Sequence, residues 1–207
     1  QFSNVYASTD EGKTIRFRGQ ADVPKRSFDE HMIVEKKDGT LWMLVRTFEG
    51  IGESYSTDGG YTWSPGHKSH IDGPCSRFHI RRLKSGRLLM INHHNFDERI
   101  DLDDIMSQGD VKKWKGRSHL TAMLSEDDGQ TWPYTLLLDE RNDASYPDAK
   151  EADDGYIYVT YDWERVKQRE ILMAKFTEED IIKGNLESKE GELRILVNKA
   201  LGQPDVE

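Results

Sequence analysis

Short runs of alternating apolar and polar residues, separated by turns that contain glycine, fill most of this chain. The clearest examples are residues 33–46 around Asp38-Gly39, residues 80–92 around Ser85-Gly86 and residues 149–162 around Asp154-Gly155. Alternation with a period of two predicts β-strands, and a short glycine turn between two such runs predicts a β-hairpin. We therefore expect an all-β fold built from strand–turn–strand units.

A second kind of turn occurs three times, with the pattern S-x-D-x-G-x-T. Its copies span residues 8–14, 56–62 and 125–131, and Trp63 and Trp132 directly follow the second and third copies. In such a turn the aspartate accepts backbone N–H groups, the glycine adopts a positive φ, and the hydroxyl groups tie down the loop ends. Because these side chains are used within the turn itself, we interpret the three copies as structural.

The two kinds of turn alternate at a regular spacing. Gly39 and Gly86 lie about 47 residues apart, which is the size of one four-stranded propeller blade. After Gly155 the spacing predicts a further strand at residues 171–176 without the second kind of turn. Residues 177–184 predict a short helix, with Thr177 and Asp180 as a capping box and Gly184 at its end. Residues 191–201 then predict a final strand that adds to a neighbouring sheet.

The longer interval between Gly86 and Ser125 indicates an insertion at residues 95–116. Two interpretations stay open, an ordered lid or a solvated loop. Trp114 within it is a candidate for stacking on a sugar. The acidic residues Asp101, Asp103 and Asp104 lack the spacing of a known calcium loop, so we assign no metal.

The repeated turns resemble the Asp-box, or BNR, repeats of the sialidase superfamily, and the resemblance extends from Ser8 to about Ile182. It implies a sialidase-type six-bladed β-propeller, of which this chain supplies about four blades. Six blades need on the order of 280 residues, and the chain has 207. We therefore expect residues 1–207 to be one partial Asp-box propeller, the C-terminal part of a larger domain. Its open edges predict self-association.

The composition of the chain limits the classes of molecule that it is expected to bind. A net charge of −9 argues against nucleic acid or an anionic membrane surface as a partner, and no apolar run has the length of a membrane span. Cys75 is the only cysteine, which excludes an internal disulfide. We expect a glycan substrate, no cofactor and a secreted or periplasmic location.

In a four-stranded blade the first strand starts, the second ends and the third starts at the edge opposite the Asp-box. Polar residues gather at these positions, and a ring of such groups at the mouth of a channel is typical of a sugar site. The candidates are Glu30, His31, Arg46, Arg77, His79, Asn92, His93, His94, Arg117, His119, Tyr146, Asp148, Asp162 and Arg165.

The resemblance assigns roles to some of them. Tyr146 matches the tyrosine nucleophile of sialidases, Glu30 the glutamate that accepts its proton, and Arg117 one arginine of the carboxylate clamp. At the position of a second clamp arginine this chain has Ile51, and Arg46 or Arg77 is the expected substitute. The family's remaining arginine and its acid/base aspartate belong to N-terminal blades, so we expect an incomplete site in residues 1–207.

We expect His79, His93, His119 and Asp148 to bind substrate. Simpler interpretations stay open: an ion pair between Glu30 and Arg46, a packing role for Tyr146 beside Pro147, and a solvated charge at Arg117. His93 and His94 point to opposite faces of a strand, which argues against a shared metal.

The sequence thus predicts a sialidase-like exo-glycoside hydrolase that acts on terminal sialic acid or another acidic sugar. One alternative is a non-catalytic carbohydrate-binding propeller. The other is a related propeller glycosidase or lyase for a different glycan, in which His79, His93 and His119 perform the acid/base chemistry.

Overall fold

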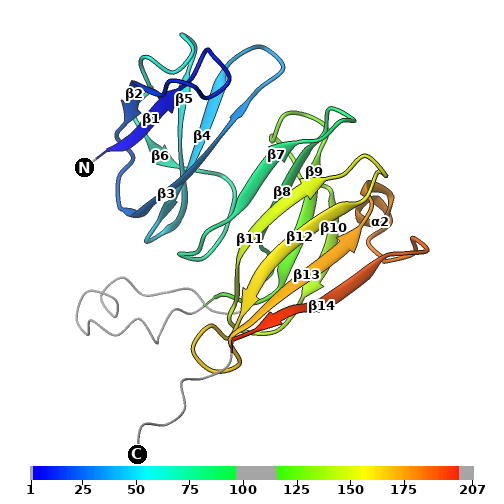
Figure 1. Cartoon of the computed structure of the whole chain (residues 1–207). Helices are drawn as coiled ribbons and strands as arrows, with labels where there is room; N and C mark the ends of the chain where they lie inside the picture. The colour runs from blue at the N-terminus through cyan, green and yellow to red at the C-terminus, as the bar shows by residue number, and fades with distance from the viewer. Residues whose placement is uncertain (1, 97–115, 201–207) are drawn as a thin grey trace, which may run out of the picture. The chain divides into compact units, whose positions relative to one another are not determined.

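The computed structural model describes residues 2–96 and 116–200 (Figure 1). Almost all regular structure in this part of the chain is β-strand, as the alternating pattern predicts. The expectations for the insertion, including those for Trp114 and the acidic cluster, lie almost wholly outside the described residues. Among the described helices none has the length and apolar character needed to cross a membrane.

The described strands form three four-stranded sheets and one two-stranded sheet, all antiparallel, with consecutive strands as neighbours. The two-stranded sheet contains β1 (Ser3–Ala7) and β2 (Arg16–Ala21). The other sheets contain β3 (Arg26–Glu35), β4 (Leu41–Thr47), β5 (Gly50–Ser56) and β6 (His67–Lys68); β7 (His79–Arg82), β8 (Leu88–His93), β9 (Leu120–Ser125) and β10 (Tyr134–Asp139); and β11 (Ala144–Glu151), β12 (Ile157–Trp163), β13 (Glu170–Phe176) and β14 (Glu192–Lys199).

The predicted hairpins join the first and second strands of these sheets. Gly39, Gly86 and Gly155 have φ values of 84°, 87° and 83°, a region that residues other than glycine rarely adopt. Each turn is closed by a backbone hydrogen bond from the glycine, for example from Gly39 N to Lys36 O at 3.0 Å. The predicted hairpins are therefore confirmed.

The Asp-box turns join the third and fourth strands, and their internal bonding is as the sequence predicts. In the second copy, Ser56 Oγ accepts the Gly60 N–H at 2.9 Å and donates to Asp58 Oδ1 at 2.8 Å, while Thr62 Oγ1 donates to Asp58 Oδ2 at 2.6 Å. The other two copies repeat these bonds. The Trp63 indole N–H donates to Gly60 O at 3.1 Å, so this tryptophan closes its turn as expected.

Bonds from the threonine at the end of each Asp-box turn hold the pKa of the three aspartates, Asp10, Asp58 and Asp127, below the ordinary value, and that of Asp127 falls to about 2. These carboxylates thus accept hydrogen bonds within their own turns. The first copy joins β1 to β2, which are thus the third and fourth strands of a blade.

The chain folds into two compact units. The first contains the described residues up to Cys75, and the second contains those from Ser76 onward. In the first unit, the core between the two sheets consists of Ala21, Val23, Met43 and Val45, with Val5, Ile33 and Trp63 packed against it. Tyr6, Ile15 and Phe17, from the β1–β2 hairpin, are exposed by 60%, 69% and 55%. Self-association through such surfaces stays a prediction.

In the second unit one apolar cluster takes side chains from both four-stranded sheets. It includes Ile91 on β8, Leu124 on β9, Leu136 on β10, Val159 on β12 and Phe176 on β13. The alternating residues on one face of each sheet therefore pack against each other, as in neighbouring propeller blades.

Helix α2 (Glu178–Lys183) takes the place of an Asp-box between β13 and β14 and packs against β9 and β10. Thr177 and Asp180 form the predicted capping box, and Gly184 ends the helix at φ 70°. The last strand, β14, pairs with β13 and completes its own sheet, whereas the sequence placed it in a neighbouring one.

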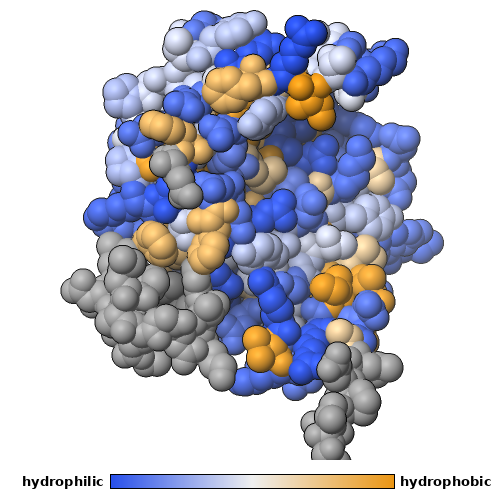
Figure 2. All heavy atoms as spheres, turned by 60° about the vertical axis from the view of Figure 1, so that its left-hand side comes forward, coloured by the Kyte–Doolittle hydropathy of each residue, from blue (hydrophilic) through white to orange (hydrophobic). Residues whose placement is uncertain are grey.

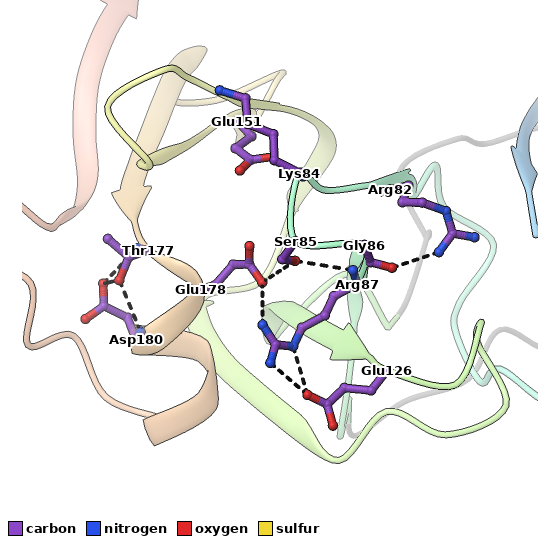
Figure 3. Close-up of polar contacts among 10 residues, drawn as sticks. All are labelled: Arg82, Lys84, Ser85, Gly86, Arg87, Glu126, Glu151, Thr177, Glu178 and Asp180. Atoms are coloured by element: carbon purple, nitrogen blue, oxygen red, sulfur yellow. Dashed lines mark hydrogen bonds and ion pairs between the residues drawn. The ribbon is translucent and has the colours of Figure 1, made fainter. Parts of the chain in front are cut away.

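Polar contacts reinforce the packing of α2 (Figure 3). The Arg87 guanidinium contacts Glu126 Oε1 at 2.9 Å within its own sheet and Glu178 Oε2 at 3.2 Å on α2. Ser85 Oγ donates to the same Glu178 oxygen at 2.8 Å. The β7–β8 hairpin is thereby tied to the helix that follows β13.

On the face drawn in Figure 2, hydrophilic residues predominate, and the apolar residues lie in several separate groups. This agrees with the high content of charged residues, 32% of the chain.

Candidate functional site

The ends of the strands lie on two opposite sides of each four-stranded sheet. We use upper edge for the side where the first strand begins and the second strand ends. We use lower edge for the side that carries the hairpin glycine. The register places Arg26, Thr47 and Gly50 together at the upper edge of the β3–β6 sheet, and Glu35, Leu41 and Ser56 together at the lower edge. The Asp-box begins at Ser56, so the predicted separation of structural turns from candidate functional groups is confirmed within the sheet.

Glu30 lies in a β-bulge on β3. The pairing with β4 shifts between Arg26↔Thr47 and His31↔Val45, and Phe28 and Asp29 in the shifted segment have φ values of 60° and 52°. A bulge redirects the side chains of a strand, and bulges are frequent next to active sites.

The redirected Glu30 accepts a hydrogen bond from Arg46 Nη1 at 2.6 Å. Arg46 is 1% exposed, and its guanidinium carbon lies 4.7 Å from the centre of the Phe28 ring, which is 63% exposed. Burial acts to lower the pKa of Arg46, but Cys75 and Glu30 raise it above its ordinary value. A buried cation is thus held beside the predicted catalytic carboxylate.

Arg46 is also the direct cross-strand partner of Ile51 on β5. Ile51 is 1% exposed and occupies the position at which the resemblance leads us to expect an arginine. The location predicted for Arg46, next to that position, is confirmed; its function as a substitute arginine stays a prediction.

Tyr146 lies in a bulge of β11, at the upper edge of the β11–β14 sheet. The register with β12 shifts between Ser145↔Asp162 and Asp148↔Thr160, and Tyr146 has a φ of 56°. Its ring is partly buried, and the guanidinium carbon of Arg165 lies 4.2 Å from the ring centre. Glu30 and Tyr146 therefore occupy corresponding bulges on the first strands of their sheets.

His79 at the start of β7 lies next to Asp148 on β11. Nδ1 of His79 and Oδ1 of Asp148 are 3.0 Å apart, although the two atoms are not aligned for a hydrogen bond. His79 is 5% exposed, and burial lowers its pKa to about 4, which Asp148 partly offsets and the charges of Arg81 and Arg77 reinforce. At neutral pH this ring is uncharged, with an exposed carboxylate beside it.

His93 ends β8 and is 1% exposed. Its Nδ1 lies 3.0 Å from Ser118 O and its Nε2 lies 3.2 Å from Ser76 Oγ. Burial lowers its pKa to about 3. Both ring nitrogens are used inside the protein, which favours a structural role over the predicted contact with substrate.

Arg117 and His119 precede β9 at the same edge. Besides burial, the positive charge of Arg117 contributes to lowering the pKa of His93. His119 has a φ of 53°, and its Nδ1 lies 3.0 Å from Ser118 Oγ. The residues described here contain no group of three or more His, Cys, Asp or Glu side chains that could hold a metal ion.

Three partners of the candidate groups were not predicted as such: Arg165, Asp162 and Phe28. Sequence reasoning placed Arg165 and Asp162 at the rim but gave them no role, and it did not consider Phe28. Left-handed residues other than glycine have no clear sequence signal, and stacking of Arg165 on Tyr146 joins residues 19 positions apart. Glu30 and Arg46 belong to the first unit and the other site residues to the second, so the convergence of Glu30, Arg117 and Tyr146 stays a prediction.

Comparison with known proteins agrees with this architecture. A model of the BNR repeat-like domain matches residues 3–159, whereas no curated protein matches the chain. An intramolecular trans-sialidase from Ruminococcus gnavus is 21% identical with a TM-score of 0.60, over 86% of this chain and 38% of that one. The leech intramolecular trans-sialidase is 19% identical with a TM-score of 0.61, over 87% and 28%.

A protein of unknown function from Dyadobacter fermentans is 22% identical with a TM-score of 0.54, over 76% of this chain and 40% of that one. At these identities the likeness shows the fold, and the chain spans 40% or less of the length of these three solved proteins. Because the domain match covers more than half of the sequence and agrees with the observed Asp-boxes and sheets, this chain belongs to the BNR repeat-like domain family, and its fold is that of part of a β-propeller.

Proposed function

We propose that this chain forms part of a sialidase-like exo-glycoside hydrolase that removes a terminal sialic acid or another acidic sugar from glycans. The observation that supports it most is the pair of matching bulges on β3 and β11, which present Glu30 and Tyr146 at the same edge of their sheets. A guanidinium lies beside each: Arg46 contacts Glu30, and Arg165 covers Tyr146.

In the proposed reaction the Tyr146 hydroxyl attacks the anomeric carbon and its proton passes to the Glu30 carboxylate. The bond from the anomeric carbon to the leaving oxygen breaks, and that oxygen takes a proton from the acid/base aspartate, which the resemblance places in another blade. A neutral nucleophile suits an anomeric centre next to a carboxylate, because an anionic nucleophile would be repelled. Water then attacks the anomeric carbon and gives a proton to that aspartate. The bond from the anomeric carbon to the Tyr146 oxygen breaks, this oxygen takes its proton back from Glu30, and the sugar leaves with retained configuration.

In this proposal the arginines bind the carboxylate of the acidic sugar. Arg117, together with Arg46 or Arg77, binds the substrate carboxylate, because a guanidinium offers paired donors to a carboxylate. Arg46 also holds the Glu30 carboxylate in place through the 2.6 Å contact. Asp148, His79 and His119 are available for the sugar hydroxyl groups.

Hydrolysis of a fluorogenic sialoside by the full-length protein tests the proposal. Tyr146→Phe should lower kcat by at least about 100-fold, because only the attacking oxygen is lost, while binding of the sugar is retained. Tyr61→Phe is the matched control: Tyr61 is also stacked with an arginine, but it lies in an Asp-box. Near-normal turnover in Tyr146→Phe would remove the tyrosine from the mechanism.

A related propeller hydrolase or lyase for a different glycan is a second candidate, favoured by the proximity of His79 to Asp148. A neutral histidine beside a carboxylate is suited to proton transfer. Under this alternative the protein acts on uronic-acid glycans and not on sialosides, and His79→Gln removes the activity. Binding to a glycan array without any turnover would instead support a non-catalytic propeller, which the loss of an arginine at Ile51 favours.

We also propose that the protein is secreted or periplasmic, where glycans of this kind are accessible. Residues 1–207 contain a single cysteine and therefore no disulfide among themselves. Fractionation of the producing cells, with detection by antibody, tests the location.

A further inference from the structure

Arg165 and Tyr146 form a stacked pair at the upper edge of the β11–β14 sheet. The guanidinium carbon lies 4.2 Å from the centre of the phenol ring, well within the range of a cation–π contact. Arg165 lies in the segment that follows β12, whereas Tyr146 is in the bulge of β11, so the contact depends on the sheet and not on local sequence.

The guanidinium is held in this position from two sides. Arg165 Nε donates to Asp162 Oδ2 at 2.8 Å, and Nη2 lies 2.6 Å from the same oxygen. The other oxygen of Asp162 accepts a hydrogen bond from Ser145 Oγ at 2.6 Å, and Nη2 of Arg165 lies 3.4 Å from that hydroxyl. Ser145 directly precedes Tyr146, so one carboxylate orients both the guanidinium and the backbone that leads into the bulge.

We propose that Arg165 is a positioning residue for Tyr146, fixing the orientation of its ring and stabilising the partial negative charge that the phenol gains as its proton passes to Glu30. This inference rests on the proposed function. A guanidinium stays charged at any pH at which proteins are active, and it attracts the electron-rich face of an aromatic ring. The attraction grows as electron density moves from the oxygen into the ring, so the contact is stronger in the transition state than in the ground state.

The left-handed backbone at Tyr146 strengthens the argument. A φ of 56° at a residue with a large side chain is uncommon, and such conformations persist where the surrounding structure enforces them. Here Asp162, Ser145 and Arg165 provide that structure. The ring orientation is therefore a product of the whole cluster, and Arg165 is the member that touches the ring face.

Substitution of Arg165 tests the inference, because its effects on kcat and on KM can be measured separately. Arg165→Gln should lower kcat about 3- to 30-fold with KM changed less than about twofold, because the lost contact acts mainly in the transition state. Arg165→Lys should restore part of the loss, since it keeps the charge but not the planar stack. Arg18→Gln, which removes the guanidinium 4.6 Å from the Tyr61 ring, is the matched control and should leave both constants unchanged.

The ring orientation is measured without turnover, in protein with ¹³C-labelled tyrosine. The Tyr146 signals are identified by their absence in Tyr146→Phe. In Arg165→Gln they should shift and narrow as the ring reorients faster, while the Tyr61 signals stay in place; in Arg18→Gln the reverse should hold. Unmoved Tyr146 signals in Arg165→Gln would overturn the inference.

The two proposals fail in different ways. If Tyr146→Phe abolishes turnover and Arg165→Gln leaves kcat unchanged, Arg165 has no positioning role but the proposed function stands. If Tyr146→Phe keeps near-normal turnover, the proposed function fails at its nucleophile, and with it the role of Arg165 in the reaction. Because Arg165 is half-exposed at a strand end, neither of its variants removes core packing.

Discussion

At the scale of residues, several positions at or beside the candidate functional groups have a left-handed backbone. Phe28, Asp29, His119 and Tyr146 all have positive φ values, although none of them is glycine. Each such residue costs roughly 1 to 2 kcal/mol relative to the right-handed region. Such a conformation persists where the surrounding structure enforces it, and these four residues lie at or beside the positions of Glu30, Arg117 and Tyr146.

The buried histidines predict how stability depends on pH. Burial lowers the pKa of His79 to about 4 and of His93 to about 3, from 6.5 in the unfolded chain. Between about pH 6.5 and pH 4 the unfolded state therefore binds more protons than the folded state, and the free energy of unfolding falls as the pH falls. Each histidine contributes up to about 1.4 kcal/mol per pH unit in this window.

Urea unfolding at pH 7 and pH 5 measures this slope. His93→Gln should make the difference between the two pH values smaller, since the group that titrates is gone. His94→Gln is the matched control, because His94 is exposed and meets water in both states. Equal slopes for the wild type and His93→Gln would show that this imidazole is not buried in the neutral form.

At the scale of elements, the four-stranded sheets share one meander topology and differ in their connections and in the bulges of their first strands. In the sheet of β11–β14 a capped helix replaces the Asp-box, and both devices satisfy backbone N–H groups with a short polar side chain. The bulges of β3 and β11 alter only a few residues of each first strand, while the pairing beyond them is regular. The element thus supplies a rigid frame for a locally irregular edge.

The helix cap is open to a direct test. Thr177 Oγ1 accepts the Asp180 N–H at 3.3 Å and donates to Asp180 Oδ2 at 2.8 Å. Thr177→Ala should lower the free energy of unfolding by about 1 kcal/mol, because the cap bonds are lost at one end of α2. Denaturant unfolding measures the change, and Glu179→Ala, an exposed residue in the same helix turn, should change it by less than about 0.5 kcal/mol.

At the scale of the whole molecule, we expect apolar packing to contribute more to the free energy of unfolding than the ion pairs between elements. In the second unit, the side chains of both sheets and of α2 share one core, with Phe176 and Ile181 fully buried. The contacts of Arg87 with Glu126 and Glu178 join the same elements, but Arg87 is 32% exposed and its contacts are partly screened by water.

Two variants separate these contributions. Phe176→Leu should lower the free energy of unfolding by roughly 1 to 2 kcal/mol, because aromatic area is lost from the core and a cavity remains. A double-mutant cycle of Arg87→Met and Glu178→Gln should give a coupling energy below about 1 kcal/mol. A coupling larger than the Phe176→Leu effect would show that the charges, and not the apolar cluster, hold α2 against the sheets.

The sequence by itself determined the features whose causes are local. The hairpins at Gly39, Gly86 and Gly155 and the cap at Thr177 depend on residues only a few positions apart, so their side chains and backbone preferences are sufficient to specify them. The same holds for the Asp-boxes, because the bonds among their serine, aspartate, glycine and threonine lie within one turn. Their regular spacing then gave the blade and the family.

Only the tertiary structure decided how the candidate groups are oriented and which partners they have. The bulges at Glu30 and Tyr146, the contact of His79 with Asp148 and the stack of Arg165 on Tyr146 depend on register and on packing between strands. These interactions join residues that are distant in the sequence, and a shift of one position in register reverses the direction of every side chain. Strand pairing therefore fixes the chemistry of the upper edge, while the order of residues along the chain fixes the frame.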